Sequence, residues 1–198
     1  MTLTRTDPHG WKRNSLELDH SWIHPLTEQE ITDLESSLQH VLKLEKKEFE
    51  LSAADFPLTP VTKRLLTQTI EATQTGFGLC VLRGFPVSRW TKEQMRTLFW
   101  CIGLNIGVPR PQGKQSQFVS DVRNTGGTYR GGTGRGYNTN SKLDFHADGS
   151  DVVGLMCLQT AKSGGESLIS SSLSAYEELE RRRPDLAKVL TEPFYFSR

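Results

Sequence analysis

The regular helical spacing of apolar residues stops near Gly103, and this change constrains the fold more than any other feature of the sequence. Before that point, apolar residues recur every three or four positions, as they do on the buried face of an amphipathic helix. From Gly107 onward the chain is rich in Gly, Asn, Gln and Thr, with short apolar runs between turn residues, a pattern typical of short strands and long loops. Helices followed by strands predict an α+β protein whose β portion is a sandwich or roll.

Three helices are expected in the first half of the chain and two further helices in the second, with one short strand before the third helix and the others after it. The helices should cover residues 28–46 behind a capping box at Thr27, a segment from Pro60 to Gly76, a segment from Thr91 to Gly103, a segment capped by Ser172 or Ser174, and a short segment from Pro184 to Leu190. The strands should cover residues 79–82, 152–158 and 167–169, with 118–119 as a further candidate. Residues 1–25 have little periodicity and are interpreted as an N-terminal arm that precedes one domain, 26–198.

The end of the sequence carries a strand without an evident partner. Residues 194–196 are aromatic and resemble the start of a strand. An exposed aromatic edge strand is a liability that proteins normally avoid. The sequence therefore predicts a domain that is incomplete at its C-terminus.

Composition excludes several classes of partner. A formal net charge of +1 gives no reason to expect nucleic acid or an acidic membrane surface as a partner. No apolar run reaches the roughly 18 residues that span a bilayer, and the polar N-terminus lacks the apolar core of a secretory signal. The expected location is cytoplasmic, with the three cysteines as reduced thiols. The oligomeric state is not predicted.

The segment 143–149 carries the chemistry. In an extended chain, side chains at alternate positions point to the same side, so Asp144, His146 and Asp148 would face one way. A neutral imidazole beside a carboxylate supplies two of the three ligands in the two-histidine, one-carboxylate sites of non-haem iron(II). The alternative is an ordinary hydrogen-bonded His–Asp pair at the end of a strand.

Several motifs in order resemble one known family. These are Leu82-Arg83-Gly84-Phe85-Pro86, His146-Ala147-Asp148, Gly164-Gly165-Glu166-Ser167 and Ser174-Ala175-Tyr176-Glu177-Glu178-Leu179. Together they resemble the TauD/TfdA family of iron(II)- and 2-oxoglutarate-dependent dioxygenases, over roughly residues 76–198. The resemblance implies a double-stranded β-helix (jelly-roll, clavaminate synthase-like) core behind N-terminal helices.

The resemblance also implies roles for single residues. His146 and Asp148 match the first two Fe(II) ligands of the family, with 2-oxoglutarate as co-substrate and O2 and a small organic molecule as substrates. Ser167 matches the hydroxyl residue that holds the distal carboxylate of 2-oxoglutarate, since serine keeps the hydroxyl donor. The alternative for Ser167 is a hydroxyl that caps a turn.

One part of the family pattern is absent. The family places a second histidine ligand, and an arginine that pairs with 2-oxoglutarate, far downstream, whereas no histidine follows His146. The chain is therefore interpreted as the N-terminal portion of an oxygenase that hydroxylates or oxidatively cleaves a small substrate, inactive alone, with its third ligand elsewhere. The alternative is a non-catalytic, degenerate relative or a fragment that binds a partner.

The Gly-rich segment Gly126–Tyr137 is predicted to be a lid over the substrate, because long loops inside a domain are usually functional. The polar groups near it are Arg130, Arg135, Tyr137, Asn138, Asn140 and Lys142. Asn140 and Lys142 directly precede the metal segment and are expected to face the substrate. The alternative for each of these residues is a solvated loop position.

Overall fold

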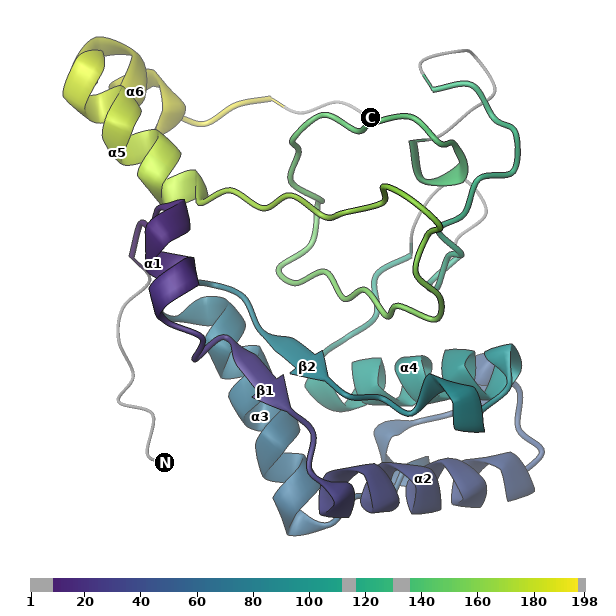
Figure 1. The fold of residues 1–198 in the computed structure, drawn as a ribbon. Helices are drawn as coiled ribbons and strands as arrows, with labels where there is room; N and C mark the ends of the chain where they lie inside the picture. Colours follow the sequence, from purple (N-terminus) through teal and green to yellow (C-terminus); the bar gives the residue numbers. More distant parts are fainter. Residues whose placement is uncertain (1–8, 112–116, 130–135, 196–198) are drawn as a thin grey trace. The chain divides into compact units, whose positions relative to one another are not determined.

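The computed structural model describes residues 9–111, 117–129 and 136–195 (Figure 1). Its helices are α1 (Arg13–Leu18), α2 (Glu28–Lys43), α3 (Pro60–Gln74), α4 (Lys92–Ile106), α5 (Ser172–Arg182) and α6 (Pro184–Leu190), and its strands are β1 (Ile23–Pro25) and β2 (Val81–Arg83). By contact, the chain divides into two compact units. Unit 1 draws on residues 1–27, 67–85 and 164–198, and unit 2 on 28–66 and 86–163.

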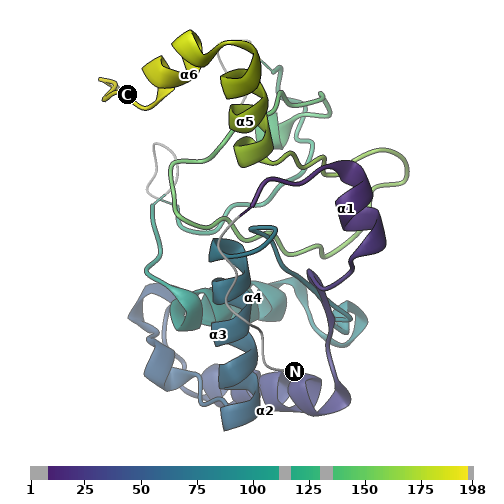
Figure 2. The same ribbon diagram turned by 90° about the vertical axis from the view of Figure 1, so that its left-hand side faces the viewer.

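The core of unit 2 lies between α2 and α4, which run side by side in both ribbon views (Figures 1 and 2). Helix α4 begins at a capping box, in which the Thr91 hydroxyl accepts from the Gln94 amide and the Gln94 side chain accepts from the Thr91 amide. This exchange satisfies backbone donors that the first turn leaves unpaired. The side chains buried in unit 2 include Leu34, Leu38, Met95, Leu98 and Cys101. Their removal from water stabilises the pair of helices.

The turn that leads into α3 is tied to α2 by polar contacts. The buried Ser37 hydroxyl lies 2.5 Å from the Pro57 carbonyl oxygen, to which it donates. The Asp33 carboxylate accepts from the Thr59 amide at 3.0 Å. Pro60 then occupies the first position of α3, where its missing N–H costs nothing.

Unit 1 contains a parallel pair of strands with Ile23 opposite Val81 and Pro25 opposite Arg83. The pair is extended at one end by the Leu26 amide, which donates to the Arg83 carbonyl at 2.8 Å. Farther along unit 1, Ser171 caps α5 by accepting from the amide of Ser174. Helix α6 begins directly afterwards at Pro184.

The expected helices are confirmed, and the strand expected at 79–82 forms as β2, shifted toward the C-terminus. Helix α1 and strand β1 both lie inside the segment 1–25, which the sequence did not predict to form regular structure. Helix α5 is capped by Ser171 rather than by either predicted serine. Within the described residues, the segments 143–149, 152–158 and 167–169 form no strand. A strand is stable only in a ladder with partners, and the described residues supply none there. The predicted jelly-roll core is not visible in this part of the chain and stays a prediction.

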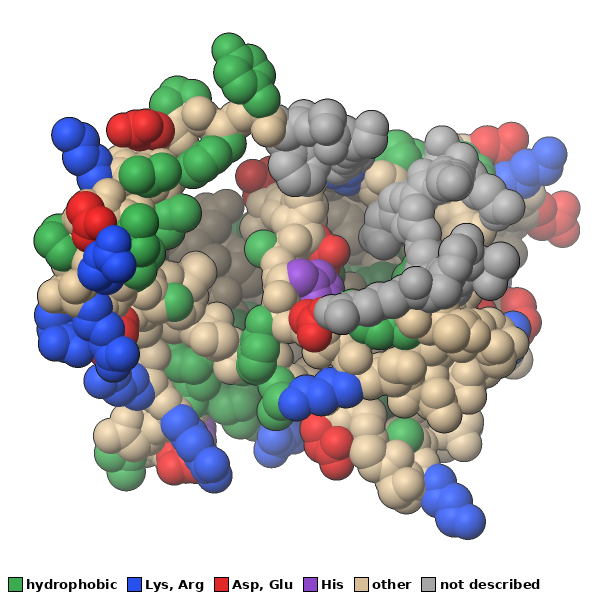
Figure 3. All heavy atoms as spheres, turned by 90° about the horizontal axis from the view of Figure 1, so that it is seen from above, with side chains coloured by type: hydrophobic (Ala, Val, Ile, Leu, Met, Phe, Trp, Pro, Cys, Tyr) green, Lys and Arg blue, Asp and Glu red, His purple; other side chains and the backbone are tan. Residues whose placement is uncertain are grey.

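The face shown in Figure 3 carries both acidic and basic side chains, with several basic side chains near one another along its left edge. Among the described helices, none has both the length and the apolar character needed to cross a bilayer.

Candidate functional site

His146 lies in unit 2, in an irregular and exposed segment, and its ring is oriented by the main chain. The Nδ1 atom lies 2.8 Å from the carbonyl oxygen of Asp144. A carbonyl oxygen only accepts, so Nδ1 carries the proton, and in the neutral ring Nε2 keeps its lone pair. Metal-binding histidines are usually fixed in this way, with one ring nitrogen donating to a carbonyl or carboxylate and the other binding the metal.

The carboxylates of Asp144 and Asp148 differ in their hydrogen bonding. The Asp144 carboxylate accepts a long hydrogen bond of 3.5 Å from the Tyr129 hydroxyl. Asp148 is exposed, and no hydrogen bond or ion pair within the described residues engages its carboxylate. Asp148 is thus the more available oxygen ligand of the two.

The donor types fit iron(II), because an unprotonated ring nitrogen and a carboxylate oxygen are two of the ligands that it takes. Across residues 9–111, 117–129 and 136–195, no three His, Cys, Asp or Glu side chains converge closely enough to hold a metal ion. The described site is therefore a pair of candidate donors.

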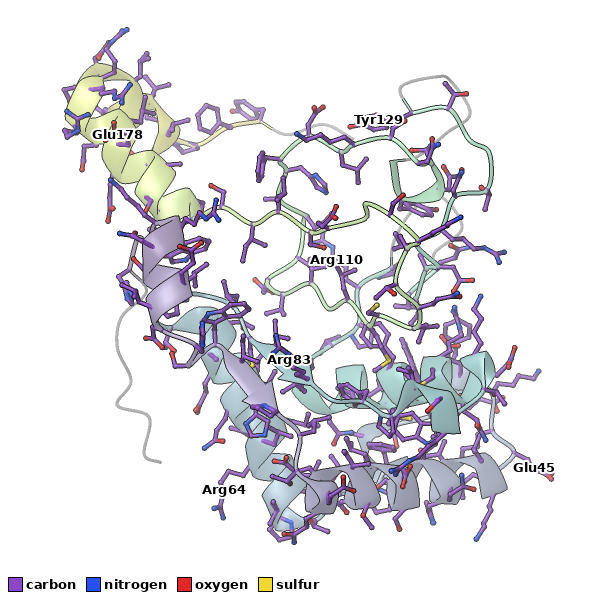
Figure 4. All side chains as sticks on the ribbon, viewed as in Figure 1. Glu45, Arg64, Arg83, Arg110, Tyr129 and Glu178 are labelled. Atoms are coloured by element: carbon purple, nitrogen blue, oxygen red, sulfur yellow. The ribbon has the colours of Figure 1, made fainter. Side chains whose placement is uncertain are left out.

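The chain that follows Asp148 is anchored to the α4 region. Arg110 donates from Nη1 to the carbonyl oxygen of Gly149, and it points into the loops in Figure 4. The backbone at Gly154 packs against the Phe99 ring of α4, where an added Cβ would lie 3.3 Å from the ring. Sequence reasoning missed Arg110 and Tyr129, since each reaches its partner across a long stretch of chain and neither belongs to a recognisable motif.

The stem of the Gly-rich loop is closed by main-chain hydrogen bonds. The Arg123 amide donates to the Tyr137 carbonyl at 3.1 Å, and the Thr125 amide donates to the Asn138 carbonyl at 3.0 Å. Gly127 packs so closely on Asn138 that a Cβ would lie 2.8 Å from the amide oxygen Oδ1. The predicted lid therefore starts from a defined base.

The same stem approaches the metal segment through Gly136, where any Cβ would clash with the side chain of Leu143. Asn140 and Lys142, the predicted substrate contacts, lie between these two residues and are exposed. Their role stays a prediction. Arg130 and Arg135 lie outside the described residues.

Ser167 belongs to unit 1, where it lines an open groove of about 1080 Å³ with Trp11, Leu168 and Ile169 among its neighbours. Its hydroxyl has no hydrogen-bond partner among the described residues, and α5 is capped by Ser171 instead. Nearby, the guanidinium groups of Arg181 and Arg182 lower the pKa of Glu178, labelled in Figure 4, to about 2. Both arginines of this helix thus share a single carboxylate.

A histidine and an unengaged carboxylate two positions apart are two of the donor types that a non-haem iron(II) site uses. Residues 40–198 match the family described as "Taurine catabolism dioxygenase TauD, TfdA family". The match covers most of the chain, and the chain belongs to this family. Its members are in general iron(II)- and 2-oxoglutarate-dependent oxygenases, and the resemblance inferred from the motifs is confirmed.

Two curated proteins are similar to this chain. The chain is 30% identical over 177 residues to the "FR-33289 synthase" of Streptomyces rubellomurinus, covering 89% of this chain and 52% of that protein. It is 28% identical over 196 residues to the "Taurine hydroxylase-like protein SAT17" of Stachybotrys chartarum, covering 94% of this chain and 50% of that protein. The chain thus spans about half the length of the curated relatives it matches.

Proposed function

We propose that this chain supplies the first two metal ligands of an iron(II)- and 2-oxoglutarate-dependent oxygenase that hydroxylates or oxidatively cleaves a small organic substrate. The observation that carries the proposal is the hydrogen bond from His146 Nδ1 to the Asp144 carbonyl. It leaves Nε2 unprotonated, two positions before Asp148, whose carboxylate no described residue engages. Family membership supports the same chemistry.

Each predicted residue has a role in this proposal. His146 and Asp148 hold the iron, which together with 2-oxoglutarate supplies the oxygen-activating chemistry when bound. The Ser167 hydroxyl donates to the distal carboxylate of 2-oxoglutarate, and Asn140 and Lys142 face the substrate. The backbone of Asp144 keeps the imidazole in the tautomer that binds metal.

We assign the third ligand, and the arginine that pairs with 2-oxoglutarate, to chain outside these 198 residues. No histidine follows His146, and the sequence spans about half of its curated relatives. The jelly-roll core is proposed to close with that same additional chain, because an unpaired edge strand exposes backbone N–H and C=O groups. With two ligands alone, metal affinity should be weak.

Paramagnetic broadening in NMR spectra tests the metal site without relying on activity. Millimolar Mn²⁺ should broaden the backbone amide signals of residues 144–149 in the wild-type chain. The effect should disappear in His146→Ala and persist in His40→Ala, which removes an exposed histidine from α2. Equal broadening of this segment in wild type and His146→Ala would refute the assignment.

A turnover assay tests the assignment of the third ligand to another part of the protein. Given iron(II), ascorbate and 2-oxoglutarate, the 198-residue chain should form no succinate above the protein-free background. Succinate formation would refute the assignment of the third ligand to another part of the protein. No local broadening by Mn²⁺ in the wild type would favour a non-catalytic relative instead.

A further inference from the structure

Unit 2 contains a polar pocket that neither the proposed metal site nor the family motifs include. Its volume is about 340 Å³, and its lining joins Arg96 of α4, six residues between Gln117 and Thr125, and the stem residues Tyr137 and Asn138. This volume lies at the small end of the range for ligand pockets, roughly 300–1,000 Å³. The space therefore suits a small polar molecule.

Two of the three charged groups in the lining are already paired. The Arg96 guanidinium donates to both carboxylate oxygens of Glu48, at 2.9 and 3.4 Å, and to the Val119 carbonyl at 3.0 Å. The Asp121 carboxylate accepts a hydrogen bond from the Lys92 ammonium, with 2.5 Å between Nζ and Oδ2, and this contact lowers the pKa of Asp121. The negative charge of Asp121 is therefore compensated at neutral pH.

Arg123 is the third charged lining residue, and its positive charge contributes to the lowered pKa of Asp121 after the Lys92 contact. Its side chain is exposed, and no carboxylate or carbonyl among the described residues accepts from its guanidinium. A guanidinium has five N–H donors arranged to meet a carboxylate or phosphate in pairs. The Tyr137 hydroxyl, likewise without a partner in the described residues, adds a donor to the same lining.

We propose that this pocket binds a small oxyanion, with Arg123 as its principal cation and the Tyr137 hydroxyl as a second donor. The Arg123 amide is bonded to the Tyr137 carbonyl, so an anion between their side chains would bridge the two sides of the loop stem. Occupancy of the pocket thus stabilises the base of the Gly-rich loop. The anion is either the acidic group of an organic molecule or a free inorganic anion, and both present the same chemistry to Arg123.

Titration of the 198-residue chain with inorganic phosphate, followed by NMR at constant ionic strength, tests the pocket. The amide signals of residues 119–125 and 137–138 should shift and saturate, with chloride as the reference anion. Arg123→Gln should weaken phosphate binding at least tenfold, because a charge-assisted, paired contact is lost. Tyr137→Phe should weaken it less.

Arg64→Gln is the matched control, since it removes the same charge from an exposed position of α3, labelled in Figure 4. It should leave phosphate affinity within twofold. Equal weakening by both arginine variants would show a general charge effect and overturn the proposal. Shifts that do not saturate, or that Arg123→Gln leaves unchanged, would overturn it as well.

Two further titrations identify the source of the anion and separate the pocket from the metal site. Methylphosphonate and acetate, titrated in place of phosphate, identify the source: tighter binding of the organic acids assigns the pocket to an organic acidic group, and tighter binding of phosphate assigns it to a free anion. His146→Ala should still bind phosphate. The pocket and the proposed metal site can therefore fail independently.

Discussion

Replacing Leu98 by alanine should destabilise unit 2 by about 3 kcal/mol. Leu98 is 0% exposed in the core between α2 and α4. Removing three buried carbons costs about 2.4 kcal/mol at ~0.8 kcal/mol per methylene. The cavity left behind adds to this, within the range of about 2.7–5 kcal/mol measured for buried Leu→Ala changes. Helix α4 also carries Phe99, which contacts Gly154, and Arg96, which lines the polar pocket. The loss of stability should therefore extend to the segment around Gly154 and to the pocket.

Urea unfolding followed by far-UV circular dichroism measures this change. With an m-value of about 1.5 kcal/mol per molar urea, 3 kcal/mol lowers the midpoint by about 2 M. Leu18→Ala is the control, because Leu18 is 86% exposed and its truncation should cost less than about 0.5 kcal/mol. A loss below about 1 kcal/mol for Leu98→Ala, or one equal to the control, would refute the packing of α4 on α2.

Two further predictions concern titrating groups of unit 2. Burial, with a smaller effect of the charges of Asp55 and Glu48, raises the pKa of the Cys101 thiol to about 12. Iodoacetamide at pH 8, followed by mass spectrometry, should therefore label the exposed Cys157 first and Cys101 only in urea. Equal labelling rates of the two cysteines in the folded protein would contradict this. Hydrogen bonds from Lys46 and Ser52 lower the pKa of Asp55 from 3.8 to about 2, so its contribution to stability is present above about pH 4 and is lost as pH falls toward 2. Melting temperatures of Asp55→Asn should therefore vary less with pH across this window than those of wild type, and parallel curves would argue against the contact.

Local signals predicted the described helices from α2 onward because their determinants lie within a few residues of one another, whereas α1 was missed. The exchange between Thr91 and Gln94 fixes the start of α4, and Pro60 and Pro184 stand at helix starts. Strand β1 could not be predicted in this way. It is three residues long, too short for periodicity, and it depends on pairing with β2 across 58 positions, as Ile23 opposite Val81 shows.

The candidate site, too, has features that the sequence shows and features that depend on contacts between distant residues. The types and spacing of His146 and Asp148 are visible in the sequence, and so is their resemblance to family motifs. The tautomer of His146 depends on the path of the main chain at Asp144, and the engagement of Asp144 by Tyr129 depends on a loop 15 residues away. The described residues supply no strand partner for 143–149, and the predicted extended conformation of this segment stays a prediction.

The hydrogen bond that orients the His146 imidazole is accepted by a backbone carbonyl and does not depend on the side chain at position 144. Every amino acid offers the same carbonyl, so substitutions there leave the ring nitrogen's proton where it is. Substitutions at position 144 should therefore be tolerated by the histidine, and only a change in the main-chain path there would reorient the imidazole.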